Sequence, residues 1–339
     1  MPVRCSVDLS TVIFLRSELA SVKISLITPA GKRSRDGNRT TAIRWAKILR
    51  DLGHQVNVAT DYDGARADMM IALHAWRTAA ASHRFHELYP DRPLIVTLTG
   101  TDINEFIHSH PETTLKSMEI ADRLVCLHDL ARDAVPKRFH RKLRVIHQSC
   151  LPLAAPRKPA KRHFEVCVIG HMRTVKDPLR AAYAVRHVPP ESRLRVTQLG
   201  KAHTDAWAKK ARAEEARNPR FRWLGDVPFG QVRREFVKTH VMVISSLAEG
   251  GANVVSEAMV AGVPVIASNI PGNLGLLGAD YPGVFPARDT KALRDMLLRA
   301  EIDPKFLSDL TRRCKARAKL FRPEQERSAW RRLIKEITA

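Results

Sequence analysis

The apolar residues of this chain gather in short, unbroken runs, and amphipathic segments separate one run from the next. Residues 94–98 and 241–244 are such runs, made of aliphatic and β-branched side chains with few polar interruptions. Unbroken apolar runs of this length are typical of strands that are buried on both faces of a parallel sheet. The intervening segments repeat their apolar positions every three or four residues, which indicates helices.

Strands and helices therefore alternate along the chain, and the alternation occurs twice. We expect strands at residues 22–28, 54–59, 68–73, 94–98, 123–127 and 144–146, and again at 165–169, 193–199, 222–224, 241–245 and 263–267. We expect helices at 39–52, 78–88, 112–120, 253–261 and 323–337. This order predicts an α/β fold with two Rossmann-like, doubly wound parallel sheets that face each other across a cleft. Ligands of such sheets bind beyond the carboxyl ends of the strands.

A proline-rich and basic connection separates the two halves. Residues 151–163 contain three prolines and no apolar periodicity, as is typical of a domain boundary. We predict an N-terminal domain over 22–155, a C-terminal domain over 156–322 and a last helix over 323–339. Residues 1–21 are interpreted as an N-terminal extension, because their apolar run at 12–15 is too short for a signal peptide.

Composition narrows the class of protein. The chain has 57 Lys and Arg against 35 Asp and Glu, a net charge of +22. Such a charge suits nucleic acid, an anionic membrane or anionic substrates. Nucleic acid is disfavoured because the charge is spread over amphipathic helices and aromatic residues make up only 6%. The five cysteines are scattered without a C-x-x-C pair, and no segment is long and apolar enough for a membrane span, so we expect a cytoplasmic protein.

The most informative stretch follows the apolar run 241–244. Gly250 and Gly251 lie at a strand-to-helix turn, and Ala252 and Asn253 lead into the helix expected at 253–261. Unpaired backbone N–H groups and the helix dipole make such a turn an anion site that suits phosphate. Carboxylates precede and follow the turn, at Glu249 and Glu257, where they can accept hydrogen bonds from sugar hydroxyls.

Glu249 and Glu257, with seven residues between them, resemble the E-x7-E signature of GT-B glycosyltransferases. The resemblance includes the surrounding Ser-Ser-x-x-Glu-Gly-Gly-Ala-Asn-Val-Val-Ser-Glu-Ala and covers roughly residues 22–335. It implies that Glu257 holds the nucleotide ribose, that Glu249 contacts the donor sugar and that the last helix crosses back to the first domain. Together with residues 270–278, the motif is most similar to selenosugar synthases of selenoneine biosynthesis, which join selenium from selenophosphate to the sugar of a UDP-sugar.

A second block supports a phosphate site. Residues 170–178 follow a strand and are expected to open a helix, and they resemble the Gly-x-x-Arg-x-x-Lys block of the same family. The resemblance implies that Arg173 and Lys176 hold the diphosphate. Fixed cations there would stabilise the charge on the departing phosphate without a metal or other cofactor. Asp61 and Asp63 imitate a metal-binding D-x-D motif, but Gly64 after them is more typical of a turn.

The acceptor side is expected at the strand ends of the first domain. His74, Arg77, Thr101 and Asp102 follow the third and fourth expected strands and resemble blocks of the selenosugar synthases. We expect Arg77 and Thr101 to bind the acceptor, and His74 and Asp102 to be catalytic by orienting water for removal of the phosphoryl group. The turn that opens the first helix is a further candidate for binding the acceptor, with the residues Gly37, Asn38 and Arg39.

The sequence therefore predicts a hexosyltransferase that moves N-acetylglucosamine or glucose from a UDP-sugar to selenophosphate, releasing UDP and phosphate. Its alternative is a conventional hexosyltransferase with a lipid or glycan acceptor at the membrane surface. The preferred sugar, inversion or retention at the anomeric carbon, and the oligomeric state stay open.

Overall fold

The structure is a computed structural model that describes residues 20–34 and 36–338. Within them the chain forms two six-stranded sheets, and neighbouring strands in each sheet run parallel. The N-terminal sheet has the order β2-β1-β3-β4-β5-β6. Its strands are β1 (Lys23–Ile27), β2 (Gln55–Ala59), β3 (Met69–Leu73), β4 (Leu94–Leu98), β5 (Arg123–Cys126) and β6 (Leu143–Val145).

The C-terminal sheet repeats this plan with the order β12-β11-β10-β7-β8-β9. Its strands are β7 (Phe164–Ile169), β8 (Leu194–Leu199), β9 (Phe221–Trp223), β10 (Val241–Ile244), β11 (Val265–Ser268) and β12 (Val284–Phe285). The predicted α/β fold with two doubly wound sheets is confirmed. The predicted domain boundary at 155/156 falls within the connection from β6 to β7, and most of the predicted extension at 1–21 lies outside the described residues.

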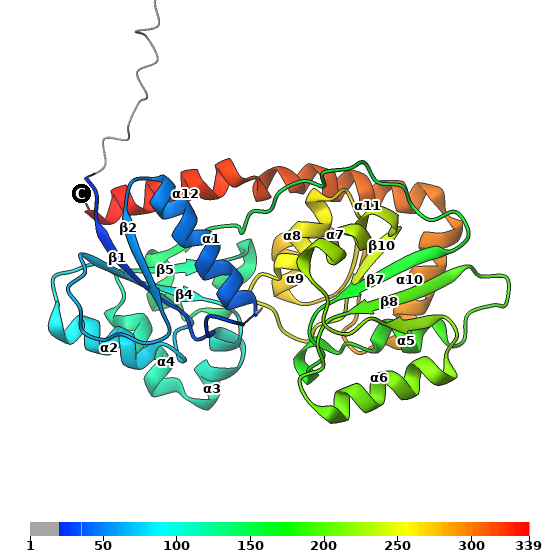
Figure 1. Cartoon of the computed structure of the whole chain (residues 1–339), viewed down its shortest axis with the longest axis horizontal. Coiled ribbons are helices and arrows are strands. Elements are labelled where there is room, and N and C mark those ends of the chain that lie inside the picture. The colour runs from blue at the N-terminus through cyan, green and yellow to red at the C-terminus, as the bar shows by residue number, and fades with distance from the viewer. Residues whose placement is uncertain (1–19, 35, 339) are drawn as a thin grey trace, which may run out of the picture.

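Helices flank both sheets (Figure 1). In the N-terminal domain they are α1 (Gly37–Asp51), α2 (Ala79–Leu88), α3 (Ile107–Ser109) and α4 (Pro111–Ile120). In the C-terminal domain they are α5 (Arg180–Val185), α6 (Asp205–Arg217), α7 (Phe229–Lys238), α8 (Asn253–Val260), α9 (Pro271–Leu277), α10 (Thr290–Ile302) and α11 (Pro304–Arg317). The short helical turns are η2 (Asp102–Phe106, a π-helix), η3 (Asp129–Ala134), η4 (Lys137–Lys142), η5 (Thr174–Lys176) and η6 (Ala318–Phe321).

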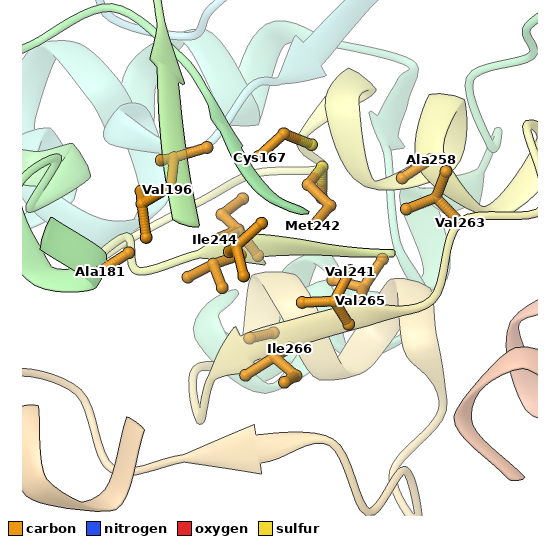
Figure 2. Close-up of a cluster of buried hydrophobic side chains, with 14 of the residues drawn as sticks. Cys167, Ala181, Val196, Val241, Met242, Ile244, Ala258, Val263, Val265 and Ile266 are labelled. Atoms are coloured by element: carbon orange, nitrogen blue, oxygen red, sulfur yellow. The ribbon is translucent and has the colours of Figure 1, made fainter. Parts of the chain in front are cut away.

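The central strands are buried on both faces, as their unbroken apolar runs indicate. Every residue of β3, β4 and β10 is buried. Figure 2 shows the C-terminal core, where Met242 and Ile244 of β10 lie among side chains from the neighbouring strands and from α8. The two sheets are therefore rigid platforms that fix the positions of the loops at their strand ends.

The last helix, α12 (Pro323–Thr338), runs back along one side of the molecule from the C-terminal domain to the N-terminal domain (Figure 1). Its buried stripe includes Trp330, whose ring meets Trp45 of α1 edge to face with centroids 4.7 Å apart. The helix thereby joins the core that α1 forms against the N-terminal sheet.

Candidate active site

The loops at the carboxyl ends of the two sheets meet between the domains. In the N-terminal sheet, His74, Thr99 and Leu127 follow strands whose last residues are paired side by side. In the C-terminal sheet, Gly170 and Gly200 follow the paired ends of β7 and β8. Loops from these two edges touch each other, so the predicted donor and acceptor segments come together.

Two glycines lie where the loops of the two domains touch. A Cβ atom at Gly250 would lie 2.2 Å from the carbonyl oxygen of Thr99, and one at Gly100 would lie 2.5 Å from the Gly250 nitrogen. Distances this short leave no room for a side chain at either position. Gly100 also has φ +120°, a conformation that favours glycine. The two loop backbones are therefore in direct contact.

A partly buried ion pair joins the donor loop to η5. Lys176 Nζ donates to Glu249 Oε1, and the Ser246 hydroxyl donates to the same oxygen at 2.6 Å. The Glu249 side chain is only 8% exposed. The structure thus brings together the first glutamate of the E-x7-E pair and the lysine of the second block, and it presents them beside Gly250 and Gly251.

The block at 170–178 differs from our prediction in its backbone. We expected it to open a helix, but η5 is a single 3-10 turn and α5 begins only at Arg180. Asp177 has a left-handed φ of 42° and Pro178 follows it, so the helix cannot start earlier. The prediction that residues 170–178 open a helix is therefore wrong, and no helix dipole acts on Arg173. Arg173 is nevertheless exposed, and no ion pair to it is found among residues 20–34 and 36–338.

A small cavity of about 20 Å³ lies over the ends of β7, β8 and β10. Its lining includes Lys176 and Glu249, and also Gln198, which the sequence analysis did not single out. The Gln198 amide nitrogen donates to the carbonyl oxygen of Gly170 at 3.1 Å, whereas its buried Oε1 has no partner within the described residues. Only its place as a polar residue near the end of an apolar strand could have marked it.

Helix α8 presents the second glutamate. Burial raises the pKa of Glu257, and the positive charges of Arg44 and Arg233 oppose that rise. Asn253, the first residue of α8, accepts a hydrogen bond from Arg44 Nη2 at 3.1 Å. Ala252 before it is buried at the N-cap position. A residue of the N-terminal domain therefore reaches the donor motif.

On the acceptor side, His74 occupies a strained position directly after β3. Its φ is +89°, which is costly for a residue with a side chain and is typical of functional sites. His74 Nδ1 accepts from the backbone N–H groups of Trp76 (3.3 Å) and Arg77 (3.1 Å). Nε2 therefore carries the proton and donates to the Thr101 hydroxyl at 2.9 Å. Burial lowers the pKa of His74, so the ring is neutral, and both of its nitrogens are occupied.

Asp102 is fully buried, and its carboxylate accepts hydrogen bonds from four backbone N–H groups. These belong to Ala75 (3.2 Å), Thr99 (2.9 Å), Gly100 (2.7 Å) and Ile103 (3.1 Å). Asp102 Oδ2 lies 4.0 Å from His74 Nδ1, too far for a hydrogen bond. This carboxylate holds the Thr99–Gly100 turn in place and has little capacity left to orient water, the role that we predicted for it.

The start of α1 faces the donor motif. A Cβ at Gly37 would lie 3.9 Å from Asn253 Nδ2, and Asp36 lies 3.9 Å from His171 Nε2. Asn38 and Arg39 follow and are half-buried. The turn that we predicted to bind the acceptor therefore lies against the donor loop.

Arg77 is exposed, and its guanidinium lies 5.5 Å from the centre of the Phe106 ring. The same ring stacks on Trp76 with centroids 4.2 Å apart. Phe106 ends the π-helix η2, an element that is frequent at functional sites. The acceptor side thus combines a cation with an aromatic plane.

The D-x-D segment forms a turn. Asp63 Oδ1 accepts from the Ala65 nitrogen at 2.9 Å, and Gly64 has φ +89°. No cluster of three or more metal-ligating side chains occurs in the described parts of the chain. Among the helices of the described residues, none has the length and apolarity needed to cross a bilayer.

Comparisons with known proteins find relatives of this chain among glycosyltransferases. Residues 154–321 match the family "Glycosyl transferases group 1". The chain is 23% identical over 320 residues to "Glycosyltransferase 1 domain-containing protein 1" of Xenopus tropicalis. The alignment covers 83% of this chain and 89% of that protein.

Two solved structures have a similar fold. One is HepE of Anabaena in complex with UDP and glucose, with a TM-score of 0.74 and 15% identity over 93% of this chain and 100% of that one. The other is sucrose-phosphate synthase from Thermosynechococcus elongatus, with a TM-score of 0.75 and 15% identity over 93% and 98% of the two chains.

Proposed function

We propose that this chain, which is a glycosyltransferase of the GT-B fold, transfers N-acetylglucosamine or glucose from a UDP-sugar to selenophosphate. The observation that carries the proposal is the meeting of the Glu249–Glu257 motif with Lys176 at the cleft. UDP as the donor nucleotide is supported by HepE, whose structure holds UDP and glucose.

In the donor site, the diphosphate would lie against the N–H groups of the Gly250–Gly251 turn, with Lys176 and Arg173 as counter-charges. Glu249 would accept from a sugar hydroxyl and Glu257 from the ribose. Lys176 is paired with Glu249 in the present structure. A bound diphosphate would draw the ammonium toward itself and leave Glu249 free for the sugar, so that both groups exchange partners when the donor binds.

An anionic selenium nucleophile fits the acceptor side. A hydroxyl acceptor needs a base, yet His74 and Asp102 already have their acceptor atoms engaged by backbone N–H groups. Selenophosphate is an anion from the start, so it needs positioning rather than deprotonation. The exposed Arg77 and the half-buried Arg39 can attract it.

The proposed reaction has two steps. Selenium attacks the anomeric carbon, a C–Se bond forms, and the bond from that carbon to the β-phosphate oxygen breaks with its electron pair leaving on UDP. Water then attacks phosphorus, the P–Se bond breaks, and phosphate and the selenosugar are released. The Thr101 hydroxyl accepts from His74, so its own proton can be donated to a phosphoryl oxygen of the acceptor.

The test is a set of incubations with UDP-N-acetylglucosamine or UDP-glucose and selenophosphate, with the products identified by mass spectrometry. We expect a selenium-containing sugar, and UDP and phosphate in equal amounts. UDP release that selenophosphate does not stimulate, with no selenium in the sugar product, would contradict the proposal.

One observation favours a second candidate, a hexosyltransferase with a glycan or lipid acceptor. The stacked Trp76–Phe106 pair offers an aromatic plane beside Arg77, a surface that suits a sugar ring or an apolar chain. In the same assay, incubation with glycan or lipid acceptors in place of selenophosphate separates the two candidates. Transfer to oxygen alone would establish the second.

A further inference from the structure

Arg44 of α1 crosses from the N-terminal domain to the donor motif. Its Nη2 donates to Asn253 Oδ1 at 3.1 Å, at the first residue of α8. Its Nε is 3.3 Å from Oε1 of Glu326 and 3.2 Å from Oε2 of the same carboxylate. The Arg44 side chain is 19% exposed. One guanidinium therefore bridges the crossover helix and the donor helix.

Glu326 fixes that guanidinium in place. It is 1% exposed, and it also accepts from Trp45 Nε1 at 2.6 Å and from the Ser149 nitrogen and hydroxyl at 2.9 and 2.5 Å. Its acceptor positions are thereby filled by donors from α1 and from the connection between the domains. A buried carboxylate that is held this way gives Arg44 a defined orientation.

Gln148 adds a second bridge to the same loop. In the amide orientation that gives each atom a complementary partner, its nitrogen donates to the Gly251 carbonyl oxygen at 3.2 Å and to Asn253 Oδ1 at 3.0 Å. Its oxygen then accepts from the Thr41 hydroxyl at 2.5 Å and from Arg44 Nη2 at 3.1 Å. The N-terminal domain thus holds both the glycine turn and the start of α8.

Glu257, one turn further along α8, lies within the field of this group. The charged and titratable groups that face it are Arg44 from α1, Arg233 from α7 and the Cys150 thiol from the connection. No hydrogen bond to the Glu257 carboxylate is found within residues 20–34 and 36–338. Its oxygens are therefore available to a ligand, and the two arginines oppose the rise in the pKa of Glu257 that burial causes.

We propose that Arg44, a residue of the acceptor domain, is a positioning residue of the donor site. It orients Asn253 through a hydrogen bond, and its positive charge favours the ionised form of Glu257 that accepts from the ribose. This inference rests on the proposed function, because it takes the nucleotide to be UDP. Since Arg44 belongs to one domain and α8 to the other, the donor site is complete only when the domains are closed. Donor affinity is therefore coupled to closure through Glu326 and α12.

Titration of the whole chain with UDP, followed by calorimetry between pH 6 and 8, tests the proposal without any acceptor. We expect Arg44→Met to weaken UDP binding at least about 10-fold, the usual effect of losing a charge-assisted hydrogen bond. The loss should be larger at pH 6 than at pH 8. Without Arg44, the Glu257 carboxylate loses a cation and takes up a proton at higher pH.

Two further variants separate charge from hydrogen bonding. Arg44→Lys keeps the charge and should restore the shallow pH profile while binding stays weaker. Arg44→Gln can still donate to Asn253 but carries no charge. Its UDP binding should therefore be less weakened, while its dependence on pH should stay steep. The matched control is Arg50→Met on the same helix, because Arg50 is exposed and its guanidinium donates to the Val56 carbonyl oxygen at 2.6 Å, away from the donor motif. Its UDP affinity should equal that of the unmodified chain.

The outcomes are distinct. Arg44 variants that fold, as judged by thermal melting, and bind UDP with the affinity and pH profile of the unmodified chain would overturn the inference while leaving the proposed function intact. An unmodified chain that binds no UDP would overturn the proposed function, and this inference with it.

Discussion

At the scale of single residues, the donor site depends on an ion pair between one cation and one largely buried carboxylate. Lys176 and Glu249 are paired, and Glu249 has little exposure to water. A buried carboxylate that loses its cationic partner destabilises the folded protein. A bound diphosphate that loses a cation is held less tightly, and the charge that develops on it in the reaction is less well stabilised. Lys176 therefore acts on both the empty and the occupied site.

Replacing Lys176 by Met should lower kcat/KM for the UDP-sugar about 100-fold, because a fixed positive charge at the departing phosphate is removed. Steady-state kinetics of UDP release measures this. Lys209→Met is the control, since Lys209 is exposed on α6. A Lys176→Met enzyme within twofold of the unmodified rate would show that the diphosphate lies elsewhere.

The residues of the donor motif were predictable because they are close together in sequence. Glu249, Gly250 and Glu257 belong to one strand-turn-helix segment, and a glycine turn before a helix predicts an anion site without knowledge of distant residues. Gln198 and Arg44 were not predictable in this way. Their roles depend on partners contributed by distant segments, such as Asn253 for Arg44, and no local spacing reports such contacts.

At the scale of elements, the cleft is set by two loops that touch backbone to backbone. Gly250→Ala should separate the Thr99 and Gly250 loops, because the new Cβ would lie 2.2 Å from a carbonyl oxygen. We expect activity to fall at least about 100-fold, as misplaced catalytic groups typically cause. Thermal melting should show that the chain stays folded.

Gly230→Ala is the matched control for that change. Gly230 lies in α7, and a Cβ there would meet nothing nearer than 3.8 Å. Alanine is favoured over glycine in a helix, so this variant should keep its activity and gain slight stability. Full activity in Gly250→Ala would mean that the loop contact is unimportant.

In the loop after β5, His128 contacts α9 of the other domain, and we predict that this contact makes the stability of the chain sensitive to acid. Burial lowers the pKa of His128 to about 4, and a Cβ at Gly275 of α9 would lie 2.3 Å from its Nδ1. Below the unfolded pKa of about 6.5, the unfolded chain binds more protons than the folded one. The free energy of unfolding should therefore fall by up to about 3 kcal/mol as the pH drops from 6.5 to 4.

Denaturant titrations at several pH values between 7 and 4 measure this slope. His128→Leu should make it shallower, whereas His187→Leu, at an exposed position, should leave it unchanged. An equal slope in His128→Leu and the unmodified chain would show that other groups cause the acid sensitivity.

Most strands and the helices α1 and α12 were predicted close to their observed bounds because their apolar patterns are local, whereas β12 and the ranges of α6, α10 and α11 were not predicted. The strand β4 was expected at its observed residues 94–98, and α12 within one residue of its observed end. The π-helix η2 was missed, since it forms where the buried Asp102 carboxylate collects backbone N–H groups from two loops. A helix was expected at residues 170–178, but only the η5 turn forms there, because the left-handed backbone of Asp177 and the following Pro178 separate it from α5.

At the scale of the whole molecule, α12 joins the two domains through a buried aromatic pair and Glu326. Trp330→Ala should lower the free energy of unfolding by about 3–5 kcal/mol, since a fully buried indole is replaced by a cavity. Denaturant unfolding measures the loss. Arg331→Ala, at the exposed neighbouring position, should change it by no more than about 0.5 kcal/mol. Equal stability of the two variants would mean that α12 contributes little.

The central claim, that the C-terminal domain holds a sugar nucleotide by its diphosphate at the cleft, is tested most directly by a crystal structure with UDP bound. We predict phosphate oxygens within about 3 Å of the Gly250 or Gly251 nitrogen and of Lys176 Nζ, with the ribose beside Glu257. UDP bound away from the Gly250–Gly251 turn, with the Lys176–Glu249 pair undisturbed, would contradict it.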